Sequence, residues 1–254
     1  MGLDHDDTAG RRKRAGVTDL PRRCTREDHP VKIYYHPAST TSRPIMLFAA
    51  EAGIHADFQV VDLFTGEHYK PPYEAINPNH LVPVLEDGDF RLTESSAILK
   101  YLAEKSGSLA YPKDLKERAR INERMDWINT QVGRDFAYGF VYPQILPTHR
   151  RSSDEVQAAT IAWGRERAAN WLGVLDRNLL GSQNRYLCGN ELTIADYFGA
   201  PFVALGDTVR CGYAEYPNVA RWLSTMKALP SWRKVNEVID GYAASLDAGT
   251  LVPL

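Results

Sequence analysis

Residues 31–53, VKIYYHPASTTSRPIMLFAAEAG, decide the fold of this chain. Residues 31–36 alternate and are rich in β-branched and aromatic side chains, which indicates a strand. Pro37 ends this strand. Residues 39–42 then place four hydroxyl side chains in a row, where the strand should give way to a helix. The sequence therefore predicts a strand-to-helix turn that carries hydroxyl groups.

The helix after this turn has its own start and stop signals. Ser42 or Thr41 suits the N-cap position, and Pro44 suits the first helical turn, where a missing N–H costs nothing. Gly53 follows an apolar face and indicates the end of the helix. The hydroxyls thus lie over a helix N-terminus, where unpaired N–H groups and the positive end of the dipole favour an anion. The alternative is that residues 39–42 only cap the helix.

Length and composition narrow the class of protein. The chain has 254 residues, which is enough for one large domain or two small ones. A formal charge of −2 argues against a nucleic-acid partner. The sequence contains no run of about 18 apolar residues, so no membrane-spanning helix is expected. Cys24, Cys188 and Cys211 are odd in number and widely spaced, so neither a disulfide framework nor a zinc site is expected. We expect a protein of the cytoplasm.

The N-terminal residues 1–30 differ from the rest. They are basic, with the run RRKR at 11–14, and they lack the apolar centre of a secretory signal. The expectation is a disordered extension; a targeting address or an anion-binding arm is the alternative.

The segment after the first helix completes a small mixed α/β domain. Residues 56–63 indicate a second strand, which should be parallel to the first because a helix joins the two. Residues 65–78 are polar and rich in proline, as in a loop. Residues 81–86 indicate a third strand. The hairpin signal at 87–89 leads into a short antiparallel strand at 90–92.

A proline interrupts the third strand. Pro83 cannot donate to a β-ladder, so it belongs at an edge or a bulge. A cis Val82–Pro83 bond is one resolution, and an ordinary trans edge proline is the other.

A second helix N-terminus carries polar side chains at residues 93–105. Here Glu94 lies beside Ser95, and the pair can hold both ends of an amino acid. The carboxylate takes an ammonium group, while the hydroxyl and the helix N–H groups take a carboxylate. The alternative is a simple capping box.

The remainder of the chain is helical in pattern. Five helices are predicted, at 115–138, 152–180, from the capping box at 193–196, at 217–229 and at 231–243, with a Gly- and Pro-rich break at 139–151. The element order is therefore β-α-β-β-β-α followed by five helices. The predicted organisation is an α/β domain at 31–105, a linker at 106–115 and an all-α domain at 116–254.

Six segments in this order resemble the cytosolic glutathione transferases. They are HPASTTSRP (36–44), GEHYKPPYEAINP (66–78), LVPVLEDGDFRL (81–92), TESSAILKYL (93–102), ELTIADYFGAP (191–201) and MKALPSWRKV (226–235). The first domain is most similar to the serine-type classes, phi and theta. The resemblance implies a thioredoxin-like N-terminal domain, an all-helical C-terminal domain, and conjugation of the glutathione thiolate to small apolar electrophiles.

The resemblance also implies the catalytic residue. Ser39 matches the family's catalytic serine, whose hydroxyl donates a hydrogen bond to the thiolate. A free thiol has a pKa near 8.5, so only a few per cent of it ionises at pH 7. A hydroxyl hydrogen bond and a helix N-terminus together are of the right size to lower this pKa by about one or two units. Thr40 is the alternative hydroxyl if the turn is shifted by one residue.

Glutathione-binding roles follow from the same resemblance. The implied residues are His68, Lys70, Val82, Pro83, Glu94 and Ser95. Val82 would pair its backbone with the cysteinyl unit, Glu94 and Ser95 would bind the γ-glutamyl end, and His68, ahead of Lys70, would hold the glycyl carboxylate.

One pair departs from the family pattern. Where relatives have Gly-Gln or a similar pair, this chain has His80 and Leu81. Leucine cannot supply a side-chain amide, so either His80 compensates or the affinity for glutathione is weak.

An acceptor pocket is expected between the domains, over Ser39. The candidate lining residues are Trp127, Phe136, Tyr138, Phe140 and Tyr142, of which at least half should belong to the helical core. The expected partners are glutathione as co-substrate, an apolar electrophile and a second copy of the chain in a homodimer, with no metal.

The sequence leaves three functions to compare. The first is an enzyme that uses the glutathione thiolate for conjugation, dehalogenation or peroxide reduction. A binding or regulatory protein without turnover is possible because of the His80-Leu81 departure. A cysteine-dependent redox protein is disfavoured, since residues 39–42 contain no cysteine.

Overall fold

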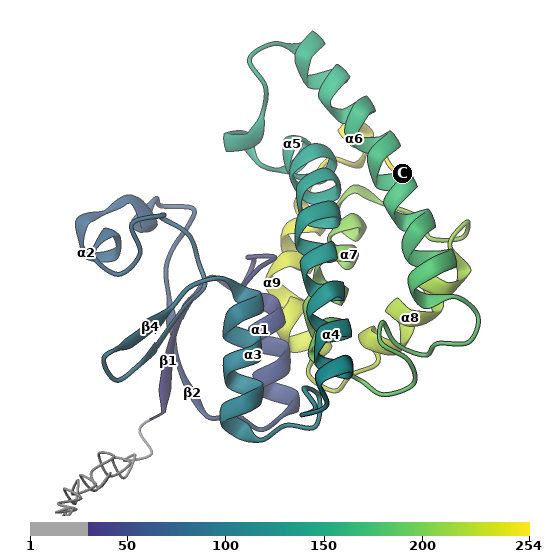
Figure 1. The fold of residues 1–254 in the computed structure, drawn as a ribbon. Helices are drawn as coiled ribbons and strands as arrows, with labels where there is room; N and C mark the ends of the chain where they lie inside the picture. Colours follow the sequence, from purple (N-terminus) through teal and green to yellow (C-terminus); the bar gives the residue numbers. More distant parts are fainter. Residues whose placement is uncertain (1–29) are drawn as a thin grey trace, which may run out of the picture.

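The structure, a computed structural model, describes residues 30–254. The predicted extension therefore lies outside the described residues apart from its last position, as does Cys24. Figure 1 shows two parts, a small sheet with its own helices and a larger group of helices beside it.

The sheet has four strands in the order β2-β1-β3-β4. Their bounds are β1 (Val31–Tyr35), β2 (Ala56–Val60), β3 (Val84–Asp87) and β4 (Phe90–Leu92). The first two strands are parallel, with Ile33 opposite Phe58, and β3 is antiparallel to both of its neighbours. This mixed sheet confirms the predicted thioredoxin-like topology.

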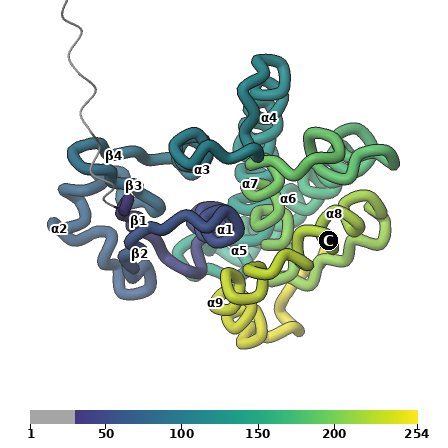
Figure 2. The backbone as a smooth tube through the Cα atoms, turned by 90° about the horizontal axis from the view of Figure 1, so that it is seen from below, coloured from purple at the N-terminus to yellow at the C-terminus, as the bar shows by residue number. Residues whose placement is uncertain are grey.

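Helices cover both faces of the sheet. The face toward the helical part carries α1 (Arg43–Glu51) and α3 (Ser95–Ser106), and the other side carries α2 (Pro71–Glu74) after the short 3₁₀ turn η1 (Glu67–Tyr69) (Figures 1 and 2). Gly53 follows the first helix with a φ of 64°, as its stop signal predicted.

The helical part follows residue 114. Its elements are α4 (Leu115–Trp127), η2 (Ile128–Val141), α5 (Tyr142–Ile145), η3 (Pro147–His149), α6 (Asp154–Val174), η4 (Leu175–Leu180), α7 (Ile194–Ala204), η5 (Leu205–Val209), α8 (Pro217–Lys227), α9 (Trp232–Ser245) and η6 (Ala248–Thr250). The predicted capping box is present, because Asp196 accepts from the backbone of Thr193 and the Thr193 side chain caps in return. An all-helical C-terminal part is thus confirmed.

One hydrophobic core runs through both parts. It joins Ile33 and Phe48 of the sheet layer to Met125 and Phe198 of the helical layer, and all four side chains are at most 1% exposed. A second, smaller cluster under α2 contains Tyr73 and other residues of the opposite face. The two parts are therefore packed together through apolar contacts.

The predicted break at Gly139 is wrong. The helix that begins at Leu115 continues through π-type hydrogen bonding in η2 and ends at Ile145. Gly139 lies where η2 crosses α6, because a Cβ on Gly164 would come within 2.2 Å of its carbonyl oxygen. Pro143 lies near the end of this run, and the helix continues past it for two more residues, to Ile145. Both residues fit a continuous helix.

Two strands are shorter than predicted. The second ends at Val60 because Asp62 turns the chain, accepting hydrogen bonds from the N–H groups of Phe64 and Thr65. The third begins only at Val84, since Leu81 turns its carbonyl oxygen toward Tyr73 and away from the sheet. Across residues 30–254, none of the helices combines the length and the apolar character that crossing a bilayer requires.

Candidate functional site

The turn between β1 and α1 holds Ser39 above the helix N-terminus. The N–H of Ser39 donates to the carbonyl of His36 at 3.0 Å, and its Oγ accepts from the N–H of Ser42 at 3.2 Å. Ser42 occupies the N-cap position, but its own side chain does not cap the helix. The Ser39 hydroxyl therefore bonds to the residue just before the helix, and it also lies 3.0 Å from Thr41 Oγ1.

The loop before β3 meets this turn. Thr41 Oγ1 donates to the carbonyl oxygen of Val82 at 2.9 Å, across 41 residues of sequence. The Val82–Pro83 bond is cis, as the first of the two sequence alternatives predicted. The residue whose backbone was predicted to pair with a ligand is thus joined to the hydroxyl turn.

The start of α3 provides the third side of the site. Glu94 precedes this helix with a φ of 65°, a left-handed conformation that is rare for a residue with a side chain. Such conformations are concentrated at ligand-binding and catalytic positions. Ser95, the first residue of the helix, is buried.

These three segments border one groove of about 80 Å³. Its lining residues are Thr41, Asn77, Asn79, Leu81, Val82, Pro83, Thr93, Glu94, Ser95, Ser96, Asn129 and Tyr138. Five residues predicted from the sequence are therefore brought together: Val82, Pro83, Glu94, Ser95 and Tyr138. Ser39 does not line the groove itself, but its hydroxyl lies 3.0 Å from Thr41 Oγ1, which does. Sequence reasoning missed the asparagines, although Asn-Pro-Asn at 77–79 is a polar turn signal beside the predicted strand.

Two histidines meet at one side of the site. His80 places its Nδ1 2.9 Å from the carbonyl oxygen of His68, and the ring of Tyr69 packs between them, 4.0 Å from His68 and 5.4 Å from His80. The Nδ1 atom of His68 is buried and has no hydrogen-bond partner among the described residues. Burial, together with the charge of His80, lowers the pKa of the His68 imidazole. Lys70 is exposed on the same loop.

The predicted aromatic residues divide between the core and the groove. Phe136 and Phe140 are at most 1% exposed and stack on each other inside the helical core. Trp127 packs edge-on against Trp171, 6.1 Å away. Tyr138, in contrast, is 51% exposed at the groove. Among the predicted aromatic residues, Tyr138 is thus the one that lines the groove, and Tyr142 next to it is partly exposed.

Tyr138 belongs to a three-ring cluster with Tyr142 and His149, whose ring centroids are 4.9 to 5.5 Å apart. Burial and the charge of Glu94 raise the pKa of the Tyr138 phenol. Burial also raises the pKa of Tyr142 to about 12, against the effects of a hydrogen bond with Thr40 and of the charge of Arg43. The predicted alternative hydroxyl, Thr40, is thus a buried partner of Tyr142 and not a groove residue.

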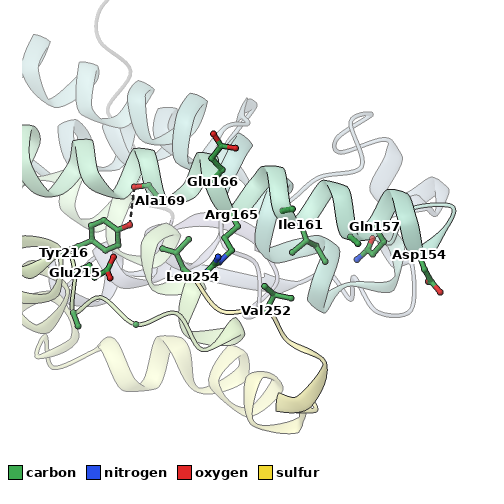
Figure 3. A pocket seen from close by; sticks show the side chains of 14 residues that line it. Asp154, Gln157, Ile161, Arg165, Glu166, Ala169, Glu215, Tyr216, Val252 and Leu254 are labelled. Atoms are coloured by element: carbon green, nitrogen blue, oxygen red, sulfur yellow. Dashed lines mark hydrogen bonds between the residues drawn. The ribbon is translucent and has the colours of Figure 1, made fainter.

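A larger groove of about 1040 Å³ lies between α6 and the C-terminal segment (Figure 3). Its floor includes Ile161, and Arg165 donates to the carbonyl of Pro253 at its edge. Tyr216 closes one end and donates to the carbonyl of Ala169. None of the residues predicted from the sequence lines this groove.

The described cysteines do not belong to the site. Burial raises the pKa of the Cys188 and Cys211 thiols to about 11. Within residues 30–254, no group of three or more His, Cys, Asp or Glu side chains is arranged to hold a metal ion. Neither of the cysteines within residues 30–254 therefore brings its sulfur to the groove.

Comparisons with known proteins agree with this geometry. The family model described as glutathione S-transferase, N-terminal domain, matches residues 29–104, and the model of the C-terminal domain matches residues 137–230. A delta-class glutathione transferase from Nilaparvata lugens is 30% identical over 85% of this chain and 97% of its own, with a TM-score of 0.73.

Two further solved structures are similar. Human glutathione transferase theta-2, in complex with glutathione and an unknown ligand, is 27% identical over 88% of this chain and 93% of its own, with a TM-score of 0.77. Glutathione transferase F2 from Populus trichocarpa is 27% identical over 84% of this chain and all of its own, with a TM-score of 0.71.

Proposed function

This chain belongs to the glutathione S-transferase family, and we propose that it conjugates the glutathione thiolate to small apolar electrophiles, with Ser39 as the catalytic residue. The observation that carries the proposal is the convergence of three segments on one groove: the hydroxyl turn at Ser39, the backbone of Val82 and the start of α3 at Glu94. Each segment offers a group that one part of the tripeptide needs.

The thiolate is the charge that the site has to stabilise. Ser39 Oγ accepts the N–H of Ser42, the N-cap residue of α1, so its own proton is available to a neighbouring acceptor. Each pKa unit by which the thiol is acidified corresponds to about 1.4 kcal/mol of preference for the thiolate. One hydrogen bond and the helix dipole supply about this amount. The nucleophile then belongs to glutathione, and the protein contributes ionisation and positioning.

The two ends of the tripeptide have complementary groups at the site. Glu94 would take the α-ammonium of the γ-glutamyl residue, and Ser95 with the N–H groups of α3 would take its carboxylate. The glycyl carboxylate would lie at His68 and His80, with Lys70 nearby. The unpaired, buried Nδ1 of His68 supports this placement, since a ligand can satisfy it.

The acceptor would lie over the same sulfur. Tyr138, Tyr142 and His149 present an aromatic surface beside the groove, which suits an apolar, planar electrophile. Phe136 and Trp127 are left out of this surface because they pack in or against the core. We further propose a two-fold dimer, in which the exposed apolar side chains of Leu81 and Phe90 find a partner.

The test is retention on immobilised glutathione, followed by turnover with a panel of halide, epoxide and hydroperoxide acceptors. Ser39→Ala should lower turnover with an aryl halide at least ~10-fold at neutral pH, because a positioned hydrogen bond to the thiolate is lost. Thr40→Ala is the matched comparison. Unchanged turnover in Ser39→Ala, with a loss in Thr40→Ala, would assign the catalytic hydroxyl to the neighbouring residue. No retention on glutathione would exclude the function altogether.

A further inference from the structure

Three oxygen atoms form a chain from the catalytic turn to the glutathione backbone site. Ser39 Oγ lies 3.0 Å from Thr41 Oγ1, which lies 2.9 Å from the carbonyl oxygen of Val82. We propose that Thr41 is a positioning residue that couples the binding of glutathione at Val82 to the direction in which the Ser39 hydroxyl donates. This inference rests on the function proposed above.

In the free protein, the number of hydroxyl hydrogens determines which of these oxygen atoms donates to which. A carbonyl oxygen can only accept, so the single hydroxyl hydrogen of Thr41 is donated to Val82. Thr41 has no second hydrogen for Ser39. The hydrogen between the two side chains must therefore come from Ser39, which donates to Thr41 Oγ1. Before glutathione binds, the serine hydrogen is directed at Thr41 and not at the position of a sulfur.

Glutathione would supply the Val82 carbonyl oxygen with a different hydrogen-bond donor. When the cysteinyl N–H of the tripeptide donates to the Val82 carbonyl, that oxygen no longer depends on Thr41. The Thr41 hydroxyl can then rotate and donate to Ser39 Oγ. No bond between heavy atoms changes, and no proton is transferred.

The rotated state completes the hydrogen bonding of the serine. Its two lone pairs accept from the N–H of Ser42 and the hydroxyl of Thr41, and its own hydrogen is directed to the thiolate. A hydroxyl that accepts hydrogen bonds is polarised and becomes a stronger donor. Ionisation of the thiol is therefore favoured only once the peptide backbone is in place.

A purely structural role for Thr41 makes a different prediction. Its hydrogen bond to Val82 also connects the turn to the loop before β3. A variant that loses this hydrogen bond would have a lower free energy of unfolding. It would not alter the pKa of a bound thiol. Thr41 is partly exposed and lines the groove, so its side chain is in place for the coupling role.

The experiment titrates the thiol of glutathione bound to the protein, through the ultraviolet absorbance of the thiolate. Thr41→Val keeps the shape of the side chain and removes the hydroxyl. It should raise the pKa of the bound thiol by about half to one pH unit. Thr41→Ser restores the hydroxyl and should restore the wild-type value. Turnover of the valine variant should fall ~3- to 10-fold below the thiol pKa and recover at high pH, with little change in KM for glutathione.

A double-mutant cycle separates the possible outcomes. If Thr41 acts through Ser39, then Thr41→Val should leave the thiol pKa unchanged in a Ser39→Ala background. An equal effect in both backgrounds, or an effect on stability alone, overturns the coupling. If Thr41→Val leaves the pKa of the bound thiol unchanged while Ser39→Ala raises it, the coupling is overturned and the proposed function stands. A silent Ser39→Ala overturns both. Thr41→Ala replaces the valine variant if that one does not fold.

Discussion

At the scale of the residue, the imidazole of His68 makes the stability of the protein depend on pH. Burial and the charge of His80 lower its pKa below the ordinary 6.5. The unfolded chain therefore binds a proton at a higher pH than the folded one. The stability that comes from keeping this ring neutral is complete above about pH 6.5 and is lost as the pH falls through the folded pKa.

We expect the free energy of unfolding to decrease as the pH is lowered below about 6.5, and His68→Gln to weaken that decrease. Glutathione should weaken it too, because a carboxylate beside the imidazole favours the protonated form. Denaturant unfolding at several pH values, with and without glutathione, measures both effects. Burial also lowers the pKa of His36, so part of the slope should persist in the variant. The same change at the exposed His55 is the control, and an equal effect there would contradict the assignment.

Single residues also show what the sequence can and cannot predict about the site. The position of Glu94 beside Ser95 could be predicted, because both residues stand at one helix N-terminus, and both line the groove. The sequence leaves two alternatives for His80, compensation for Leu81 or a weak affinity, because its contact with His68 depends on how an irregular loop returns to the strand. The hydroxyls at 39–42 look alike in the sequence. The structure gives them different partners: Ser42, Val82 and Tyr142.

At the scale of the element, the crossing of η2 and α6 depends on Gly164. A Cβ at this position would lie 2.2 Å from the carbonyl oxygen of Gly139 and 2.9 Å from the backbone N of Phe140. Backbone atoms of a helix cannot yield as a flexible side chain can, so the two helices would have to separate.

Gly164→Ala should therefore lower the free energy of unfolding by about 1–3 kcal/mol, in spite of the better helix propensity of alanine. Gly241 in α9 is the matched control, since a Cβ there would meet nothing within 4 Å. Gly241→Ala should stabilise the protein by about 0.5–1 kcal/mol. Chemical denaturation of both variants measures the contrast. Two stabilising changes would show that the crossing is looser than described.

The elements themselves were predictable where pattern and local signals agree. The Thr193–Asp196 capping box and the parallel pairing of β1 and β2 are of this kind. The helix break at 139–151 was predicted from two prolines, and it is wrong because the chain stays helical through Pro143 to Ile145. A local pattern does not include α6, the helix that packs against this run at Gly139.

At the scale of the whole molecule, the buried Arg43 joins the two parts. It is the first residue of α1, it is 1% exposed, and its Nη1 donates to Asn236 Oδ1 of α9 at 2.6 Å. Its Nη2 is 3.4 Å from the carbonyl oxygen of Pro201 in α7. Burial lowers the pKa of this guanidinium to about 10. A charged group is thus kept inside the interface by two neutral acceptors.

Asn236→Leu should destabilise the protein by about 3 kcal/mol, because it leaves a buried charge short of an acceptor. Asn236→Asp keeps an acceptor oxygen and adds a countercharge, and the bond that Asn236 Nδ2 donates to the carbonyl oxygen of Trp232 is lost in both variants, so the aspartate should cost less. Thermal unfolding of the two variants gives the comparison. An equal loss in both would mean that the packing of Asn236, and not its bond to Arg43, holds the interface.

The raised thiol pKa values of Cys188 and Cys211 have a consequence for the proposed reaction with electrophiles. Cys188 is partly buried and Cys211 is buried. A protonated thiol is a poor nucleophile, so in that reaction neither side chain should compete with glutathione for the electrophile. A maleimide dye added to the folded protein should leave both positions unlabelled while it consumes free glutathione.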